Sequence, residues 1–214
     1  MRCRGVMQSR AELWAYVAAF AHSPLARWAG LYPWELTARS GQFVAELVNC
    51  VPQADFAISD AIAIHHTARI EDGSVIKGPA VIGPDCLIAS GAYVRGGTWL
   101  ESDVIVGPGA ELKSSYVFSG SKLAHFNFVG DSVLGRGVNL EAGSVIANRR
   151  NERADTEIRV RQDAGSTGIG ARKFGALVGD DCRIGANAVV APGALLRPGT
   201  VLGRLALLDQ ERDA

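Results

Sequence analysis

The chain has 214 residues, a length that fits one domain with an accessory segment. Hydrophobic residues make up 48% and charged residues 21%, which excludes a wholly disordered chain. Lys and Arg balance Asp and Glu at 22 each, so no global field favours nucleic acid or an acidic membrane. The apolar runs are too short to span a bilayer and no secretory leader follows Met1. We therefore expect a cytoplasmic protein that binds neither nucleic acid nor membrane.

The N-terminal part of the sequence, residues 1–52, is expected to be helical. Residues 9–21 and 34–49 carry apolar residues at helical spacing, and residues 23–33 form a turn-rich joint between them. We expect these helices to cap the first coil of the repeat that follows, because the open end of a stacked β-structure exposes unpaired strand groups.

From residue 64 onward a large apolar residue recurs at every sixth position, which is the dominant pattern of the sequence. The series runs Ile64, Ile70, Ile76, Ile82, Ile88, Val94, Leu100, Val106, Leu112 and Phe118. The phase is lost over 119–127, resumes at Phe128, Leu134, Leu140 and Ile146, and returns at Val178, Ile184, Val190, Leu196 and Leu202. Small residues, Cys86 and Cys182 among them, stand two positions before the large ones, so both sets point inward from short strands. The period predicts an all-β fold, a parallel β-helix with three hexads per coil of eighteen residues.

The repeat sets the expected domain boundaries. We expect the β-helix over residues 53–204, a polar insertion at about 148–175, and a C-terminal tail over 205–214. The insertion includes a loop-like stretch at 163–170 and, between residues 148 and 173, seven of the 22 Lys and Arg residues. A long insertion in a compact solenoid favours a functional or subunit-bridging role.

Two basic residues stand one coil apart on the same face of the predicted helix. Arg95 and Lys113 are eighteen residues apart, and each follows a large inward residue. Like charges on neighbouring strands are destabilising, so an anion, especially a phosphate, between them is the functional interpretation. The alternative is that both cations are solvated and splayed apart, with Glu111 neutralising part of their charge.

His125 lies where the repeat loses phase, in the stretch 123–131. A histidine among apolar residues is often a satisfied structural side chain. His125 follows Lys113 by two thirds of a coil, which predicts a place near the same groove, and a neutral imidazole suits proton abstraction near pH 7. The sequence has no motif with metal-ligand spacing, so we expect no metal, and the inward thiols of Cys86 and Cys182 are expected to be inert.

The residues around these positions resemble a known family. The segments 93–95, 111–114, 124–131, 137–143 and 147–148 are similar to the acetyltransferase half of bifunctional sugar-1-phosphate nucleotidyltransferase/acetyltransferases, and residues 33–36 and 172–180 extend the resemblance. It implies a left-handed parallel β-helix of the hexapeptide-repeat acyltransferase type and a homotrimer with active sites between subunits. It also implies site residues: His125 as general base; Arg95, Glu111, Lys113, Phe128, Asn139, Asn148 and Lys173 on the substrate; Ala142 and Ala186 on acetyl-CoA. Phe128 stands where the family has a tyrosine.

The resemblance implies an acetyl-CoA-dependent N-acyltransferase that acts on the amine of an amino-sugar 1-phosphate. Acetyl-CoA is the co-substrate, and backbone amides near Ala142 and Gly143 are candidates for stabilising the oxyanion. The family's nucleotidyltransferase half has no counterpart in the sequence, so we do not expect nucleotidyl transfer. Two alternatives stay open: acyl transfer to a nucleotide-linked sugar, and a non-catalytic β-helix that scaffolds a separate nucleotidyltransferase. The basic insertion is long enough that it could reach substrate, or the phosphates of CoA, across a subunit boundary, and the sequence does not assign its role.

Overall fold

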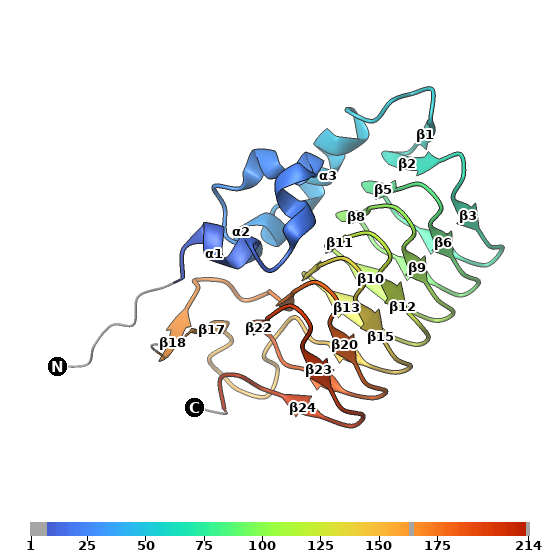
Figure 1. Cartoon of the computed structure of the whole chain (residues 1–214). Coiled ribbons are helices and arrows are strands. Elements are labelled where there is room, and N and C mark those ends of the chain that lie inside the picture. Colours follow the sequence, from blue (N-terminus) through green and yellow to red (C-terminus); the bar gives the residue numbers. More distant parts are fainter. Residues whose placement is uncertain (1–7, 163–164, 213–214) are drawn as a thin grey trace.

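A computed structural model describes residues 8–162 and 165–212 of the chain. Its main body is a three-sided solenoid of short parallel strands, in which each side is one continuous sheet (Figure 1). The left-handed parallel β-helix predicted from the hexad period and the resemblance is confirmed.

The three sheets follow one another around each coil in the order A, B, C. Sheet A consists of β1 (Phe56–Ser59), β2 (Ile62–His65), β5 (Ala80–Ile82), β8 (Thr98–Leu100), β11 (Tyr116–Val117), β14 (Val133–Leu134), β19 (Ala176–Val178) and β22 (Ala194–Leu196). Sheet B consists of β3 (Arg69–Ile70), β6 (Leu87–Ile88), β9 (Ile105–Val106), β12 (Lys122–Leu123), β15 (Asn139–Leu140), β20 (Arg183–Ile184) and β23 (Val201–Leu202). Sheet C consists of β4 (Val75–Ile76), β7 (Tyr93–Val94), β10 (Glu111–Lys113), β13 (Phe128–Gly130), β16 (Val145–Ile146), β21 (Val189–Val190) and β24 (Leu207–Leu208). Strand β24 continues the repeat into the stretch expected to be a tail.

The register corrects the expected phase of the repeat in the middle of the chain. Leu112 pairs with Val94 and Val117 pairs with Leu100, so the step from Leu112 to the next inward residue is five rather than six. A second five-residue step, from Val129 to Leu134, falls at the same corner one coil later. Val117 and Val129 therefore enter the core instead of the expected Phe118 and Phe128. Phe118 packs in a second cluster on the outer face of sheet A.

Short helices form the N-terminal segment. They are α1 (Arg10–Trp14), η1 (Ala18–His22), η2 (Pro24–Trp28), α2 (Pro33–Ala38) and α3 (Ser40–Val48). Ser9 starts α1 with a reciprocal capping box, in which Glu12 N donates to Ser9 Oγ and Ser9 N donates to the Glu12 carboxylate. Pro33 occupies the first turn of α2, where its missing N–H costs nothing.

The helices cover the outer face of sheet A and do not cap the open end of the first coil (Figure 1). Their apolar side chains pack on outward-facing residues of that sheet, which include Val81, Trp99, Tyr116 and Leu177. At the end of sheet A, β1 pairs with β2 in the antiparallel direction and supplies edge hydrogen bonds. The expected cap is thus wrong in position: the helices bury a flat apolar face. None of the described helices has the length and apolar character to cross a membrane.

The insertion leaves the solenoid after β16 and returns before β19. It forms a hairpin of β17 (Arg159–Gln162) and β18 (Gly165–Gly168), whose connection at 163–164 lies outside the described residues. Ile158 and Val160 are fully buried in the same cluster as the helices, and β17 lies against β22. The hairpin therefore covers the last coils of sheet A, on the same side as α1 (Figure 1).

Candidate functional site

The outer face of sheet C brings together several of the predicted acceptor-site residues. Tyr93, Glu111 and Phe128 occupy the same register position in β7, β10 and β13. Arg95 and Lys113 occupy the next outward position along this face, and Arg95 N donates to Leu112 O at 2.8 Å. The stacking expected from the eighteen-residue spacing is therefore present.

Each of the two stacked cations is paired with a carboxylate. Arg95 Nη1 lies 2.8 Å from Glu111 Oε1, and this hydrogen bond raises the pKa of the Arg95 guanidinium. Lys113 Nζ lies 3.0 Å from Asp131 Oδ2, and both side chains of that pair are largely buried. Like-charge repulsion between Arg95 and Lys113 is therefore compensated within the chain and does not by itself require a bound anion. Asp131 was missed as a site residue, although it stands eighteen positions after Lys113.

Asn148 and Phe128 adjoin the same pair. Asn148 Nδ2 donates to Asp131 Oδ2, so one carboxylate holds both Lys113 and Asn148. A Cβ added at Gly130 would lie 2.6 Å from Asn148 Nδ2 and 3.0 Å from Phe128 Cζ, so a side chain there would displace the Asn148 amide. Exposed Lys173 lies at the same corner, because the N–H of Phe174, the next residue, donates to Asn148 O at 3.1 Å. This group forms the end of sheet C nearest to sheet A.

His125 lies at the other end of sheet C, at the corner with sheet B. Its side chain is exposed, and its carbonyl oxygen accepts a hydrogen bond from Gly143 N at 2.9 Å. The strand β13 separates it from the corner that holds Lys113 and Asp131. Within a single chain His125 and Lys113 therefore mark opposite ends of one face, and that they line one groove stays a prediction.

The corner that carries His125 is fixed from both sides. Phe126, the next residue, has a left-handed backbone (φ 53°), and its exposed ring lies directly over Gly109 in the preceding coil. Asn127 turns inward and is buried, and its Nδ2 donates to Glu141 O at 2.8 Å and Ser144 Oγ at 2.9 Å. The backbone of His125 is therefore held between two coils while its imidazole stays accessible.

The residues predicted to meet acetyl-CoA lie on the same edge of the solenoid as His125. Ala142 O accepts a hydrogen bond from Asn187 N at 3.0 Å, and Ala186 O accepts one from Leu205 N at 2.9 Å. Ala142 directly precedes Gly143, whose N–H binds His125, so the corners of three successive coils form one ladder. The Glu141 carboxylate accepts from Ala186 N and from Arg204, and these hydrogen bonds, that from Arg204 first, lower the pKa of Glu141.

Asn139 lies apart from the other acceptor residues. Its exposed side chain stands on the outer face of sheet B, between Lys122 and Arg183 in register. A cavity of about 280 Å³ adjoins it; the lining residues include Glu141, Arg183 and Arg204. Within one chain, Asn139 does not share a face with Arg95 and Lys113.

The basic insertion is tied to its own chain. Arg150 is almost fully buried, and its guanidinium forms two hydrogen bonds of 2.7 Å with the buried carboxylate of Asp209. This contact raises the pKa of Arg150 and lowers that of Asp209. Arg153 and Arg159 both pair with Glu211. These three arginines anchor the insertion to the end of the solenoid; that the insertion reaches a ligand across a subunit boundary stays a prediction.

The inward cysteines are inert thiols, as expected. Burial raises the pKa of Cys86 to about 12 and also raises that of Cys182. Both are buried in the solenoid core, and Cys86 Sγ donates to Glu101 O. In residues 8–162 and 165–212, no three His, Cys, Asp or Glu side chains gather closely enough to hold a metal ion.

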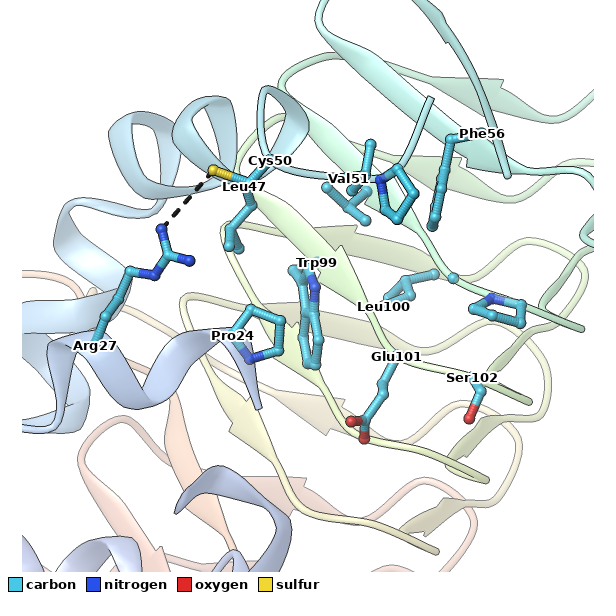
Figure 2. A pocket seen from close by; sticks show the side chains of 14 residues that line it. Pro24, Arg27, Leu47, Cys50, Val51, Phe56, Trp99, Leu100, Glu101 and Ser102 are labelled. Atoms are coloured by element: carbon cyan, nitrogen blue, oxygen red, sulfur yellow. Dashed lines mark hydrogen bonds between the residues drawn. The ribbon is translucent and has the colours of Figure 1, made fainter. Parts of the chain in front are cut away.

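A separate apolar cavity of about 460 Å³ lies between the helices and sheet A (Figure 2). Trp99 stands in its wall, and at its rim Arg27 Nη1 donates to Cys50 Sγ at 3.9 Å. Burial raises the pKa of Glu101, which lines the cavity and accepts a hydrogen bond from Ser119 N. None of the predicted site residues lines this cavity.

Comparison with known proteins supports the repeat and the resemblance. Residues 79–114 match the family described as bacterial transferase hexapeptide (six repeats), and residues 175–208 match the hexapeptide repeat of succinyl-transferase. The bifunctional sugar-1-phosphate nucleotidylyltransferase/acetyltransferase of Sulfurisphaera tokodaii is 35% identical over 180 residues, covering 73% of this chain and 44% of that protein. The bifunctional protein GlmU of Methanococcus vannielii is 29% identical over 191 residues, covering 84% of this chain and 43% of that protein.

The chain thus spans less than half the length of these relatives. Among solved structures, the acetyltransferase domain of PglB from Neisseria gonorrhoeae gives a TM-score of 0.28 at 15% identity, covering 70% of this chain and 52% of that chain. The class that fold and sequence define is a β-helix of transferase hexapeptide repeats. In particular, the chain is similar to part of the bifunctional nucleotidylyltransferase/acetyltransferases, which confirms the resemblance predicted from the sequence.

Proposed function

We propose that the protein is an acyltransferase that moves an acetyl group from acetyl-CoA to the amine of an amino-sugar 1-phosphate. One observation carries this proposal: the His125 corner joins the edge that holds Ala142 and Ala186 to the face that holds Glu111, Lys113 and Phe128. A donor lying along the edge and an acceptor lying on sheet C would meet at the imidazole. The name of the Sulfurisphaera tokodaii relative, which includes acetyltransferase, supports the same reaction class.

His125 is assigned the role of general base. As the acceptor nitrogen attacks the thioester carbonyl, Nδ1 or Nε2 of His125 takes the amine proton, a C–N bond forms and the C–S bond breaks. The proton then passes from the imidazolium to the departing thiolate, which leaves as CoA thiol. The exposed position of the side chain gives both reactants access to it, and a base of this kind contributes about 10²–10⁴-fold to the rate.

The backbone amide of Ala142 is the better candidate for stabilising the oxyanion. Gly143 N, the other predicted donor, is already bound to His125 O. This hydrogen bond links the base to the coil that would hold the thioester, so it orients the base relative to the donor. Preorganised hydrogen-bond donors of this type stabilise the negative charge that develops on the carbonyl oxygen in the transition state.

The acceptor phosphate is assigned to Arg95 and Lys113. Their carboxylate partners hold both cations at fixed places on sheet C, which lowers the entropic cost of forming charge-assisted contacts with a phosphate. Asn148 and Lys173 border the same corner and would contact the sugar or its phosphate.

A homotrimer would complete the site. Asn139 stands on sheet B, and a second copy is needed to bring it near the sheet C residues of the first. Sheet A is covered by the helices and the hairpin, so sheets B and C and their shared corner stay available for association. Exposed apolar side chains at and beside this corner, Phe126, Val189, Leu205 and Leu207, favour such burial.

The proposal is tested by measuring CoA thiol release from acetyl-CoA with glucosamine 1-phosphate, galactosamine 1-phosphate and the free amino sugars as acceptors. We expect turnover with at least one sugar phosphate, exceeding that with the free sugar. An absence of thiol release with every acceptor, with acetyl-CoA bound, would favour the scaffold alternative. The second candidate is acyl transfer to a nucleotide-linked sugar. It is supported by Lys77, a third basic residue on the outer face of sheet C.

A further inference from the structure

Lys77 adds a third rung to the column of cations on sheet C. It stands eighteen residues before Arg95, and Ile76 pairs with Val94 in the same register in which Val94 pairs with Leu112. Lys77 N donates to Val94 O at 2.8 Å, as Arg95 N does to Leu112 O. The side chains of Lys77, Arg95 and Lys113 therefore leave from equivalent positions of three successive coils.

All three cations reach forward by one coil, but the first meets no carboxylate. Arg95 reaches Glu111 and Lys113 reaches Asp131. Lys77 Nζ instead lies 5.3 Å from the ring centroid of Tyr93, which occupies the register position of Glu111. Among the described residues, Lys77 takes part in no ion pair within 4 Å, and its ammonium group rests over the face of the Tyr93 ring.

The local charge of this face is consequently uneven. Two of the three stacked cations are ion-paired with carboxylates, and the unpaired one, Lys77, has an exposed side chain. Tyr93 joins that end to the phosphate clamp, because its ring also lies 5.9 Å from Arg95 Cζ. An anion that reaches beyond Arg95 would gain a contact that costs little desolvation.

The spacing of the rungs sets the size of the ligand. Neighbouring strands lie about 4.8 Å apart, so Lys77 and Lys113 are separated by roughly 10 Å along the sheet. A phosphate held between the Lys113 and Arg95 rungs lies about one and a half strand spacings, roughly 7 Å, from the Lys77 rung, whose ammonium group rests over Tyr93. We propose that the acceptor carries a diphosphate: one phosphate lies between Lys113 and Arg95 and the other between Arg95 and Lys77, as in a nucleotide-linked amino sugar. This inference rests on the proposed function for the place of the sugar amine near His125.

The test measures binding separately from turnover. Titration calorimetry would give the affinity of glucosamine 1-phosphate, UDP-glucosamine and UDP for the full chain and for Lys77→Gln, Lys77→Arg and Arg69→Gln. Arg69 is an exposed cation on sheet B of an early coil and serves as the matched control. Circular dichroism and thermal melts establish that each variant is folded.

We expect UDP-glucosamine to bind the unaltered chain about 10-fold more tightly than glucosamine 1-phosphate. Lys77→Gln should weaken UDP-glucosamine and UDP about 10-fold and glucosamine 1-phosphate less than 2-fold, while Lys77→Arg and Arg69→Gln keep the original affinities. Equal losses for both sugars, or no loss at all, would overturn the inference. Thiol release from acetyl-CoA separates the inference from the proposed function. If UDP-glucosamine binding depends on Lys77 but no acetyl transfer occurs, only the proposed function is refuted. If glucosamine 1-phosphate is acetylated but Lys77→Gln does not weaken UDP-glucosamine more than glucosamine 1-phosphate, only the inference is refuted.

Discussion

Replacing Gly109 with alanine should impair acetyl transfer through the corner that carries His125. Gly109 has a left-handed backbone (φ 67°), and the ring of Phe126 lies over it. A Cβ added there would come within 2.5 Å of Phe126 Cδ1 and 2.7 Å of Cε1. The matched control is Gly91→Ala, one coil earlier, where φ is 76° and the nearest atom to the added Cβ is Gly109 N at 3.7 Å.

Both substitutions place an alanine in a left-handed backbone conformation, but only Gly109→Ala also creates a steric clash with a ring. An alanine in the left-handed region costs about 1–2 kcal/mol in each case, so both variants should lose similar stability from the backbone. Only Gly109→Ala must also push the Phe126 ring away by about 1 Å to restore ordinary contact. Displacements of this size at a catalytic group cost up to about 10²-fold. Since the exposed ring can turn aside in part, we expect kcat to fall about 10-fold for Gly109→Ala and less than 2-fold for Gly91→Ala.

The assay is steady-state thiol release at saturating acetyl-CoA, accompanied by urea unfolding of each variant. A double-substitution cycle with Phe126→Gly sharpens it, because glycine accepts the left-handed backbone and removes the ring. In the Phe126→Gly background, Gly109→Ala should have no further effect on kcat. If Gly91→Ala and Gly109→Ala lower kcat equally, or if the effect persists without the ring, the link between Gly109 and His125 is wrong.

Three further predictions concern the clamp, the insertion and the assembly. Arg95→Ala and Lys113→Ala should each raise KM about 10-fold for a phosphorylated acceptor and little for the free sugar; equal effects on the two acceptors would contradict a phosphate clamp. Asp209→Asn should lower the free energy of unfolding by about 2 kcal/mol at pH 7, because buried Arg150 loses its two 2.7 Å hydrogen bonds to a buried carboxylate and keeps only the longer contacts with Glu152 and Glu211. Since Arg150 holds the pKa of Asp209 below its usual value, this stabilisation is present above the unfolded-state pKa of about 4 and is lost as the pH falls through the folded-state pKa. Urea unfolding at pH 7 and pH 3 measures the difference, and a difference independent of pH would contradict the assignment. Light scattering should give three times the chain mass of 22.6 kDa, whereas a stable monomer would exclude the shared site.

The solenoid could be predicted from the sequence because each inward position is set by burial in a narrow core. Ile88, Val94 and Leu100 recur at intervals of six since every hexad supplies one strand and one corner. The period failed at Leu112 and Val129, where the corner between sheets C and A is one residue shorter. Phe118 follows the first short step and Phe128 precedes the second, so each lies one residue from a true inward position and the six-residue period misassigns both.

The sequence also contains a pattern that indicates which face of the solenoid the helices cover, but the stronger pattern of inward residues obscured it. Outward positions of sheet A are apolar in coil after coil, as at Val81, Trp99, Val133, Leu177 and Leu195, whereas those of sheet B include several charged or polar residues and those of sheet C include Glu111. An outward apolar stripe at coil spacing indicates a face that another element must cover. It would have indicated helices along a side of the solenoid rather than over its end.

The candidate site could be predicted only as a set of stacked positions. Spacing placed Arg95 and Lys113 together, but it could not show that Glu111 and Asp131 neutralise them, because that depends on side-chain reach. Nor could it place Arg150 in a buried ion pair with Asp209, since these residues are 59 positions apart and meet through the path of the insertion.

The role of His125 as the base is the central claim, and comparison of His125→Asn with the unaltered chain tests it most directly. Acetyl-CoA affinity and thiol release should be measured on the same preparations, with the acceptor that gives the highest turnover. The proposed mechanism predicts that acetyl-CoA binds within about 2-fold of its original affinity while kcat falls at least 10²-fold, because only the proton transfer from the amine is lost. Full turnover by His125→Asn would contradict the mechanism.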